Sequence, residues 1–227
     1  MFIGHFGLGF GAKKAASTIS LGTYFIAVQF LDLLWPVLLL LDIEHAVIKP
    51  GTGHSQPIDF TDYPISHSLA MVIVWALLFG FVYWIIKKNI KAAVILGLCV
   101  ISHWVLDLIV HLPDLPLYPG SDSPMLGFKL WNSFWGTLVV EGGIFITGLV
   151  LYMRSTTAKN NQGRIGLWLL VGLLLVSHAA NIFGPPPPSM NAVAWAGNLQ
   201  WLFVILAYWV DANRSKADQA EAKQRNR

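Results

Sequence analysis

The sequence predicts an all-α membrane protein, a bundle of six transmembrane helices plus a short N-terminal interfacial or re-entrant helix. Hydrophobic residues make up 55% of its 227 residues and charged residues only 12%, whereas soluble domains carry about 25% charged residues. Six apolar segments reach the length of about 20 residues that a helix needs to cross a bilayer. We therefore expect residues 1–211 to form a single integral membrane domain and residues 212–227 a polar cytoplasmic tail.

The first element precedes the spans. Residues 2–12 are apolar but too few to cross a bilayer, so we expect a helix that either re-enters from one side or lies in the interface. In both cases Lys13 and Lys14 would lie at the lipid headgroups, and re-entry would carry His5 about 12 Å into the membrane. Small residues allow helices to pack closely, and this segment has four glycines: Gly4, Gly7, Gly9 and Gly11.

The six spans then follow in order, each a mostly apolar stretch between polar connections. They are expected at about residues 20–41, 66–86, 91–111, 130–153, 165–183 and 193–210. Pro64 and Ser66 mark the start of the second span, because proline and serine are common where helices begin. The run Pro185–Pro188 cannot be helical and is expected to stiffen the last outer turn.

The basic residues indicate the orientation of the bundle. Two Lys follow the N-terminal element, three Lys or Arg lie in the second connection, three in the fourth and five in the tail, whereas the opposite side has only Lys49 and Lys129. Loops rich in Lys and Arg stay in the cytoplasm, so both termini are expected there. Topology thus accounts for the net charge of +3, and nucleic acid is not an expected partner.

Ionisable residues inside the predicted spans point to a site. His103, Asp107 and His111 follow one another at intervals of four residues and so share one helix face. Asp32 and His103 both lie about 18 Å from the cytoplasmic face, near the midplane, whereas His111 lies about 12 Å beyond His103. Because buried ionisable groups are costly and mark functional sites, we expect His103 and Asp107 to act with Asp32. His111 is expected to cap the span or to face the outer water.

These residue types suit a metal ion. Imidazole nitrogen and carboxylate oxygen are ligands for zinc, manganese or iron, and the single cysteine, Cys99, excludes a cysteine-based zinc site. A divalent ion would offset the cost of burying Asp32 and Asp107, and it would lower the pKa of a bound water to about 7, which is suited to hydrolysis. Without a metal, the same groups could form a proton relay or hold helices together by hydrogen bonds.

Two further ionisable residues lie near the midplane. Glu141 precedes Gly142 and Gly143, a pattern typical of close helix approach, and His178 lies in the fifth span. Polar contacts between helices would be enough to account for both. They are also the candidates for residues that contact and support the metal ligands, but the sequence identifies no catalytic base.

Four motifs in this order resemble those of the YdjM-like family of proposed membrane-bound metal-dependent hydrolases. They are Gly4-His5, the segment from Gln29 to Pro36 that contains Asp32, Tyr63-Pro-Ile-Ser-His67-Ser, and Ser102-His103-Trp-Val-Leu-Asp107. The resemblance covers about residues 1–112. It departs from the family pattern where Phe30 replaces a second Asp and where Tyr63-Pro64 replaces a His-Arg pair.

The resemblance implies metal binding by five residues: His5, Asp32, His67, His103 and Asp107. It also implies hydrolysis of a membrane-associated ester or phosphoester, so the lipid bilayer and a lipid-like substrate are the expected partners. A small transporter that uses the same residues for a proton, metal ion or solute is the first alternative. A structural membrane protein without catalytic activity is the second. The sequence determines neither the substrate nor the oligomeric state.

Overall fold

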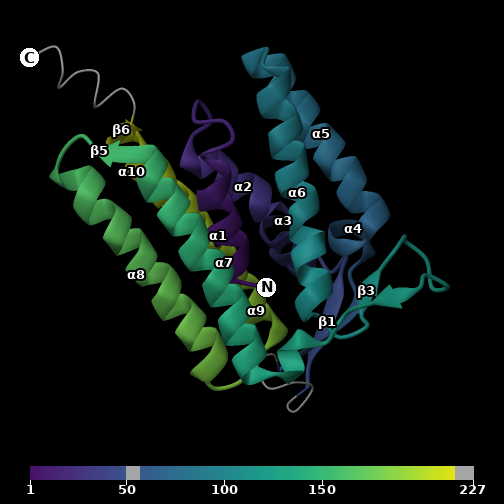
Figure 1. The fold of residues 1–227 in the computed structure, drawn as a ribbon. Helices are drawn as coiled ribbons and strands as arrows, with labels where there is room; N and C mark the ends of the chain where they lie inside the picture. Colours follow the sequence, from purple (N-terminus) through teal and green to yellow (C-terminus); the bar gives the residue numbers. More distant parts are fainter. Residues whose placement is uncertain (50–56, 218–227) are drawn as a thin grey trace, which may run out of the picture.

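The computed structural model describes residues 1–49 and 57–217, and it confirms the predicted all-α class (Figure 1). Helices account for most of this part of the chain, and the strands, each two to five residues long, form only isolated antiparallel pairs. The helices are α1 (Ile3–Ala12), α2 (Leu21–Val28), α3 (Phe30–Leu40), α4 (Pro64–His67), α5 (Leu69–Lys87), α6 (Ile90–Val110), α7 (Phe134–Ser155), α8 (Asn161–Phe183), α9 (Met190–Asn198) and α10 (Gln200–Ala212), with a 3₁₀ turn at Leu130–Asn132.

Five segments are long and apolar enough to cross a membrane: α5, α6, α7, α8 and the combined α9–α10 segment, Met190–Ala212. The α2–α3 pair makes a sixth if it is taken as one bent span. Large apolar side chains cover the outside of these helices, with Leu77, Val139 and Val176 each about two-thirds or more exposed. Such a surface requires lipid around it, so the chain is an integral membrane protein.

Polar N-caps explain where several spans begin. Ser68, Asn89, Ser133 and Asn160 each accept, through the side-chain oxygen, a hydrogen bond from the backbone N–H three residues later, at the starts of α5, α6, α7 and α8. Serine and asparagine favour this position because they satisfy an N–H group that has no partner within the helix. The caps therefore determine the residue at which each of these four helices begins.

The N-terminal helix α1 lies inside the bundle. Its first turn is in the middle of the molecule and its last turn is at the end where α2 begins (Figure 1). It packs on α7, α2 and α6, and most of its side chains are buried. This placement fits a re-entrant helix rather than a surface anchor. The Lys13 side chain does not extend outward to the headgroups, because its ammonium is buried and paired with Asp211 at 2.6 Å.

Glycine makes the closest helix contact possible. A Cβ atom on Gly7 would lie only 2.5 Å from the Phe145 Cα of α7, and Gly148 on α7 lies directly against Gly7. The expected contact at Gly142 and Gly143 is wrong, since a Cβ at either position would meet no described atom within 4 Å. The glycine of α7 that lies against α1 is therefore Gly148, further along the helix than Gly143.

The first span is broken, which the sequence did not predict. Residues 20–41 were expected to form one helix, but α2 ends at Val28 and α3 begins at Phe30, with a bend of 58° between them. The side chains at the break are polar and buried: Gln29 lies between the helices and donates to Gln200 of α10 at 2.8 Å. Bonds to neighbouring helices thus stabilise the interrupted backbone.

Small antiparallel sheets close both ends of the bundle. At one end β1 (His45–Ile48) pairs with β2 (Ile58–Asp62), and β3 (Leu115–Pro116) pairs with β4 (Met125–Leu126). At the other end β5 (Thr156–Ala158) pairs with β6 (Arg214–Lys216), so the start of the expected tail is tied to the bundle; residues 218–227 lie outside the described part.

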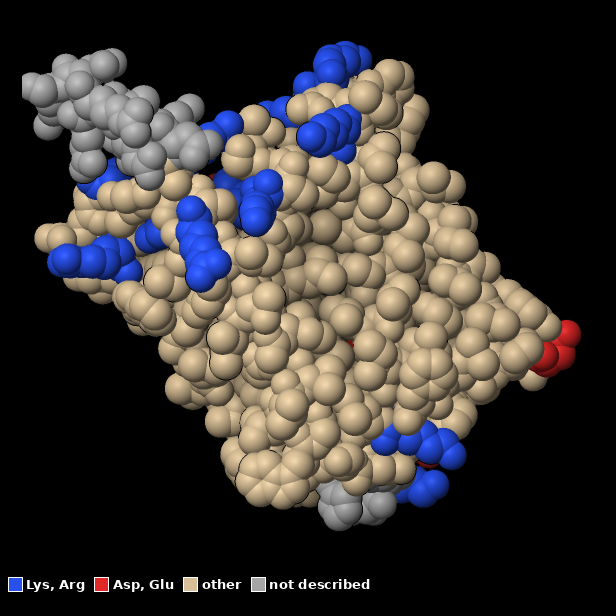
Figure 2. Space-filling view, in the orientation of Figure 1, with Lys and Arg blue, Asp and Glu red and all other residues tan. Residues whose placement is uncertain are grey.

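Lys and Arg side chains gather at the end of the bundle where α5 meets α6 and where β5 pairs with β6 (Figure 2). Few lie at the opposite end, near β1 and β3 (Figures 1 and 2). The fold therefore brings the basic connections of the sequence together on one side of the apolar bundle.

Candidate metal centre

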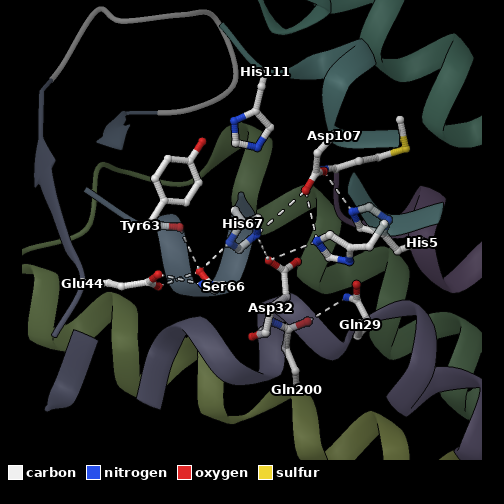
Figure 3. Close-up of polar contacts among 12 residues, drawn as sticks. His5, Gln29, Asp32, Glu44, Tyr63, Ser66, His67, Asp107, His111 and Gln200 are labelled. Carbon is white, nitrogen blue, oxygen red and sulfur yellow. Dashed lines mark hydrogen bonds and ion pairs between the residues drawn. The ribbon is translucent and has the colours of Figure 1, made fainter. Parts of the chain in front are cut away.

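The five residues expected to bind metal converge in the interior of the bundle (Figure 3). Asp32 Oδ1 lies 3.6 Å from the Nε2 atoms of both His67 and His103. Asp107 Oδ2 lies 3.0 Å from His103 Nε2 and 4.0 Å from His67 Nε2, and Asp107 Oδ1 lies 3.0 Å from His5 Nε2. The side chains come from α1, α3, α4 and α6, so residues more than 100 positions apart meet at one point.

The ligand atoms form two overlapping groups. His5, His103 and Asp107 make one group, and Asp32, His67 and His103 make the other, with all atoms of a group within 4.8 Å of one another. His103 belongs to both groups and therefore lies at the centre. Four of the five residues are buried, and Asp32 is the most exposed.

His103 is oriented by the break in the first span. Its Nδ1 lies 2.7 Å from the carbonyl oxygen of Val28, the last residue of α2. A carbonyl only accepts, so Nδ1 carries the proton and donates, and in a neutral ring Nε2 has a free lone pair. Nε2 makes no hydrogen bond of good geometry in the described structure although it is buried. A buried lone pair that faces two carboxylates fits a cation between them.

His67 is oriented in the same way by a side chain. Its Nδ1 lies 2.7 Å from Ser66 Oγ, which in turn donates to Glu44 Oε2 at 2.6 Å. Tyr63 packs against His67 and its hydroxyl donates to Asp114 at 3.4 Å. Burial raises the pKa of the Tyr63 phenol well above its usual range, so this hydroxyl stays protonated.

His5 enters the centre from the re-entrant helix. Its ring stacks on the His103 ring with 3.7 Å between centroids and 6° between planes. Its Nδ1 is buried and, within the described residues, has no hydrogen-bond partner. The amino group of Met1 also lies here, 2.5 Å from Asp107 Oδ1. Asp107 is thus the acceptor around which the first turn of α1 is arranged.

The donor set fits a divalent ion of the zinc or manganese type. Two carboxylates and three imidazoles supply oxygen and nitrogen ligands, and the one cysteine, Cys99, lies elsewhere in the core. His103 Nε2 remains buried without a hydrogen bond among the described residues, a state that costs free energy unless another partner is present. An ion beside this nitrogen would satisfy it and would add positive charge next to Asp32 and Asp107, of which Asp107 also pairs with the Met1 amino group.

Glu141 and His178 lie behind the start of α1 and belong to neither group. Glu141 Oε2 accepts the backbone N–H of Phe2 at 2.8 Å, and the Phe2 ring stacks on His178 with centroids 6.3 Å apart. Both nitrogens of His178 are buried without a partner among the described residues. The two side chains therefore support the turn that carries His5.

His111 is also outside both groups. It is the C-cap residue of α6, it is buried, and its Nδ1 contacts Asp114 Oδ1 at 2.9 Å. The expectation that it caps the span is therefore the one that the structure supports, and exposure to outer water is wrong.

A cavity of about 770 Å³ leads to the centre. Asp32, His67 and Asp107 line its inner end, and Pro185–Pro188 and Trp131 line other parts of its wall. Gln200, whose amide reaches the Asp32 carbonyl at 3.4 Å, lines it as well. Neither Gln200 nor Glu44 was singled out from the sequence, since an isolated amide and an acid in a polar loop give no distinguishing pattern.

Comparison with known proteins identifies a family. A sequence model of the family described as YdjM inner membrane protein matches residues 2–184, most of the chain. The match confirms the resemblance predicted from four motifs and extends well beyond the segment that contains them. No curated protein and no solved structure matches the chain.

Proposed function

Because the chain belongs to the YdjM inner membrane protein family, we propose that it is a metal-dependent hydrolase of the bacterial cytoplasmic (inner) membrane. Its substrate would be a membrane-associated ester or phosphoester. The observation that carries this proposal is the convergence of His5, Asp32, His67, His103 and Asp107, with the buried Nε2 lone pair of His103 directed at two carboxylates.

The ion would be held by these five side chains, with His103 at the centre of the set. When bound, zinc or manganese supplies Lewis-acid activation of the scissile bond and of water. The chain itself holds the ligands in place: the Val28 carbonyl fixes the proton of His103 on Nδ1, and Ser66 does the same for His67. Such outer partners orient metal-binding imidazoles.

Glu141 and His178 would act as positioning residues. The Glu141 carboxylate anchors the Phe2 N–H, and the His178 ring stacks on the Phe2 side chain. Both contacts fix the first turn of α1 and hence His5. No side chain of the described structure is assigned as the general base.

The cavity supports a membrane-associated substrate. Its lining has no Lys or Arg in the described part of the chain, and much of its wall is apolar, including Phe60, Trp131 and Phe203. Apolar walls with a few polar groups at one end suit an amphiphile whose reactive bond lies at the polar end. Gln200 would orient that bond next to Asp32.

We further propose that both termini face the cytoplasm. The basic end of the bundle, at β5–β6 and the α5–α6 turn, would be the cytoplasmic one by the positive-inside rule. The cavity wall at Pro185–Pro188 would then lie toward the outer face, because this loop is at the opposite end of α8 from β5.

Metal content tests the proposal directly. Elemental mass spectrometry of protein purified without chelators is expected to find stoichiometric zinc or manganese. The variants His103→Ala and Asp107→Ala are expected to lose this metal. His45→Ala is the matched control, because its side chain is half exposed in β1 and lies outside both ligand groups. Wild-type protein without stoichiometric metal would falsify the metal centre. A panel of lipid esters and phosphoesters, assayed with the same variants, tests the hydrolase activity.

The broken first span favours one alternative, a small transporter. Discontinuous helices with polar groups at the break form ion and solute sites in many transporters, and Asp32 lies in the first turn of α3 just after the 58° bend. Flux into proteoliposomes that disappears in Asp32→Asn, without hydrolysis of any ester, would support this function instead. If a variant with Asp32, His103 and Asp107 all replaced by apolar residues keeps its cellular function and gains stability, the protein is structural.

A further inference from the structure

Glu44 lies in the segment between α3 and β1, far in sequence from every predicted ligand, yet its carboxylate is fully buried at 1% exposure. We infer that Glu44 is a positioning residue that acts through Ser66 to keep the Nε2 lone pair of His67 available to a cation. The inference rests on the proposed metal centre. It assigns to this acid a role that neither the motifs nor the family match gives it.

Three hydrogen bonds link Glu44 to the centre (Figure 3). Glu44 Oε1 accepts the Ser66 backbone N–H at 2.7 Å, and Glu44 Oε2 accepts the Ser66 hydroxyl at 2.6 Å. Ser66 Oγ then lies 2.7 Å from His67 Nδ1. All three residues are buried, so water does not compete for these groups.

The chemistry of each group determines which atom donates in the hydrogen bonds from His67 through Ser66 to Glu44. An ionised carboxylate can only accept, so the single hydroxyl proton of Ser66 is directed to Glu44. The Ser66 oxygen must therefore accept from His67, whose Nδ1 carries the proton. His67 Nε2 is then left with its lone pair, and it faces Asp32 Oδ1 at 3.6 Å and Asp107 Oδ2 at 4.0 Å.

A purely stabilising role explains Glu44 poorly. Within the described residues its carboxylate accepts hydrogen bonds from Ser66 and forms no ion pair with Lys or Arg. A buried acid without a cation is costly, and a neutral amide could satisfy the Ser66 backbone N–H equally well. An amide, however, cannot accept at both of its ends, and this difference makes the test specific.

The variant Glu44→Gln is expected to reverse the direction of these hydrogen bonds while the side chains keep their positions. The amide oxygen would retain the Ser66 N–H, so the NH₂ group would occupy the former Oε2 position and donate to Ser66 Oγ. The hydroxyl proton would then turn to the nearest acceptor, His67 Nδ1 at 2.7 Å, rather than the Tyr63 carbonyl at 3.5 Å. His67 would carry its own proton on Nε2 and lose that ligand atom.

The first measurement is the tautomer of His67, from ¹⁵N chemical shifts of histidine-labelled protein treated with chelator. We expect the proton on Nδ1 in wild type and on Nε2 in Glu44→Gln. The second is zinc affinity by competition with a chromogenic chelator, which is expected to fall about 10-fold to 100-fold in Glu44→Gln and Ser66→Ala. Ser66→Thr keeps a hydroxyl and is expected to retain most of the affinity.

Asp62→Asn is the matched control. Asp62 is also a carboxylate next to a histidine Nδ1, 3.6 Å from that of His45, but both side chains are at least half exposed and His45 belongs to neither ligand group. The control is expected to leave zinc affinity unchanged. Circular dichroism and thermal unfolding of each variant separate loss of metal from loss of fold.

The outcomes separate the inference from the proposed function. If wild-type His67 carries its proton on Nε2, or if Glu44→Gln alters neither tautomer nor affinity, the role of Glu44 is wrong even when the protein binds zinc. If wild type binds no zinc, the metal centre is wrong, and the tautomer shift in Glu44→Gln still tests whether Glu44 controls His67.

Discussion

The contact between α1 and α7 gives a quantitative test of the re-entrant helix. In Gly7→Ala the new Cβ would lie 2.5 Å from Phe145 Cα and 2.7 Å from Phe145 N, whereas ordinary contact begins at 3.4 Å. The obstacle is helix backbone, which cannot rotate away as a side chain can, so α1 must shift by about 0.9 Å, the difference between 3.4 and 2.5 Å. Overpacking of this kind costs about 1–3 kcal/mol.

A second glycine provides the control. Gly143 lies on α7, and a Cβ atom added there would have no described atom within 4 Å, so Gly143→Ala should gain about 1 kcal/mol from helix propensity. Gly7→Ala gains the same propensity, so the difference in unfolding free energy between the two variants isolates the overpacking cost of about 1–3 kcal/mol. Unfolding in detergent, followed by circular dichroism, measures it.

The same shift should reach the metal centre. His5 precedes Gly7 by half a turn, and a displacement of about 0.9 Å exceeds the tolerance of about 0.2 Å in metal–ligand distances. We therefore expect zinc affinity to fall at least about 10-fold in Gly7→Ala and to stay at the wild-type value in Gly143→Ala. Equal stability and equal affinity in the two variants would refute the placement of α1 inside the bundle.

Three further predictions follow from the structure. Lys13→Met should destabilise the fold by about 3–5 kcal/mol, because it leaves the buried Asp211 carboxylate without the ammonium 2.6 Å away; thermal unfolding should show partial recovery in the double variant with Asp211→Asn. Chelator should lower the melting temperature of wild-type protein and zinc at about 100 times its Kd should restore about 2.7 kcal/mol, whereas no response to either contradicts a structural role of the ion. With Cys99→Ala as background, a membrane-impermeant maleimide applied to intact spheroplasts should label Ser121→Cys but not Lys87→Cys, and the reverse pattern would invert the proposed orientation.

The spans could be predicted because their signal is local. A window of about 20 apolar residues is the requirement that the bilayer imposes, and α5, α6, α7 and α8 each satisfy it within a few residues of the expected bounds. His103 and Asp107 could be paired for the same reason, since a spacing of four residues places them on one helix face, and the structure brings Nε2 and Oδ2 to 3.0 Å.

Residues that meet through tertiary folding gave weaker signals. A second span that began at residue 66, as expected, would place His67 at its first turn, away from the midplane where Asp32 and His103 were expected. The structure starts α5 at Leu69 and makes Pro64–His67 a separate turn, with Ser68 extended between them. That break lets the His67 ring turn toward Asp32 rather than follow the axis of α5. Glu44 was beyond prediction because its partner Ser66 is 22 residues away in a different element.

The break in the first span connects fold and site. In a continuous helix the Val28 carbonyl would accept the N–H of Asp32, four residues on; at the bend it accepts from His103 Nδ1 instead. Pro36 has no N–H, so the Asp32 carbonyl is also left free within α3, and Gln200 donates to it. One carbonyl before the bend thus orients the central imidazole, and another after it ties α3 to α10. The first bond depends on the interruption at Gln29 and the second on Pro36. A substitution that restored a continuous helix at Gln29 would remove the acceptor of His103 and displace Asp32, so the centre could not form without the bend.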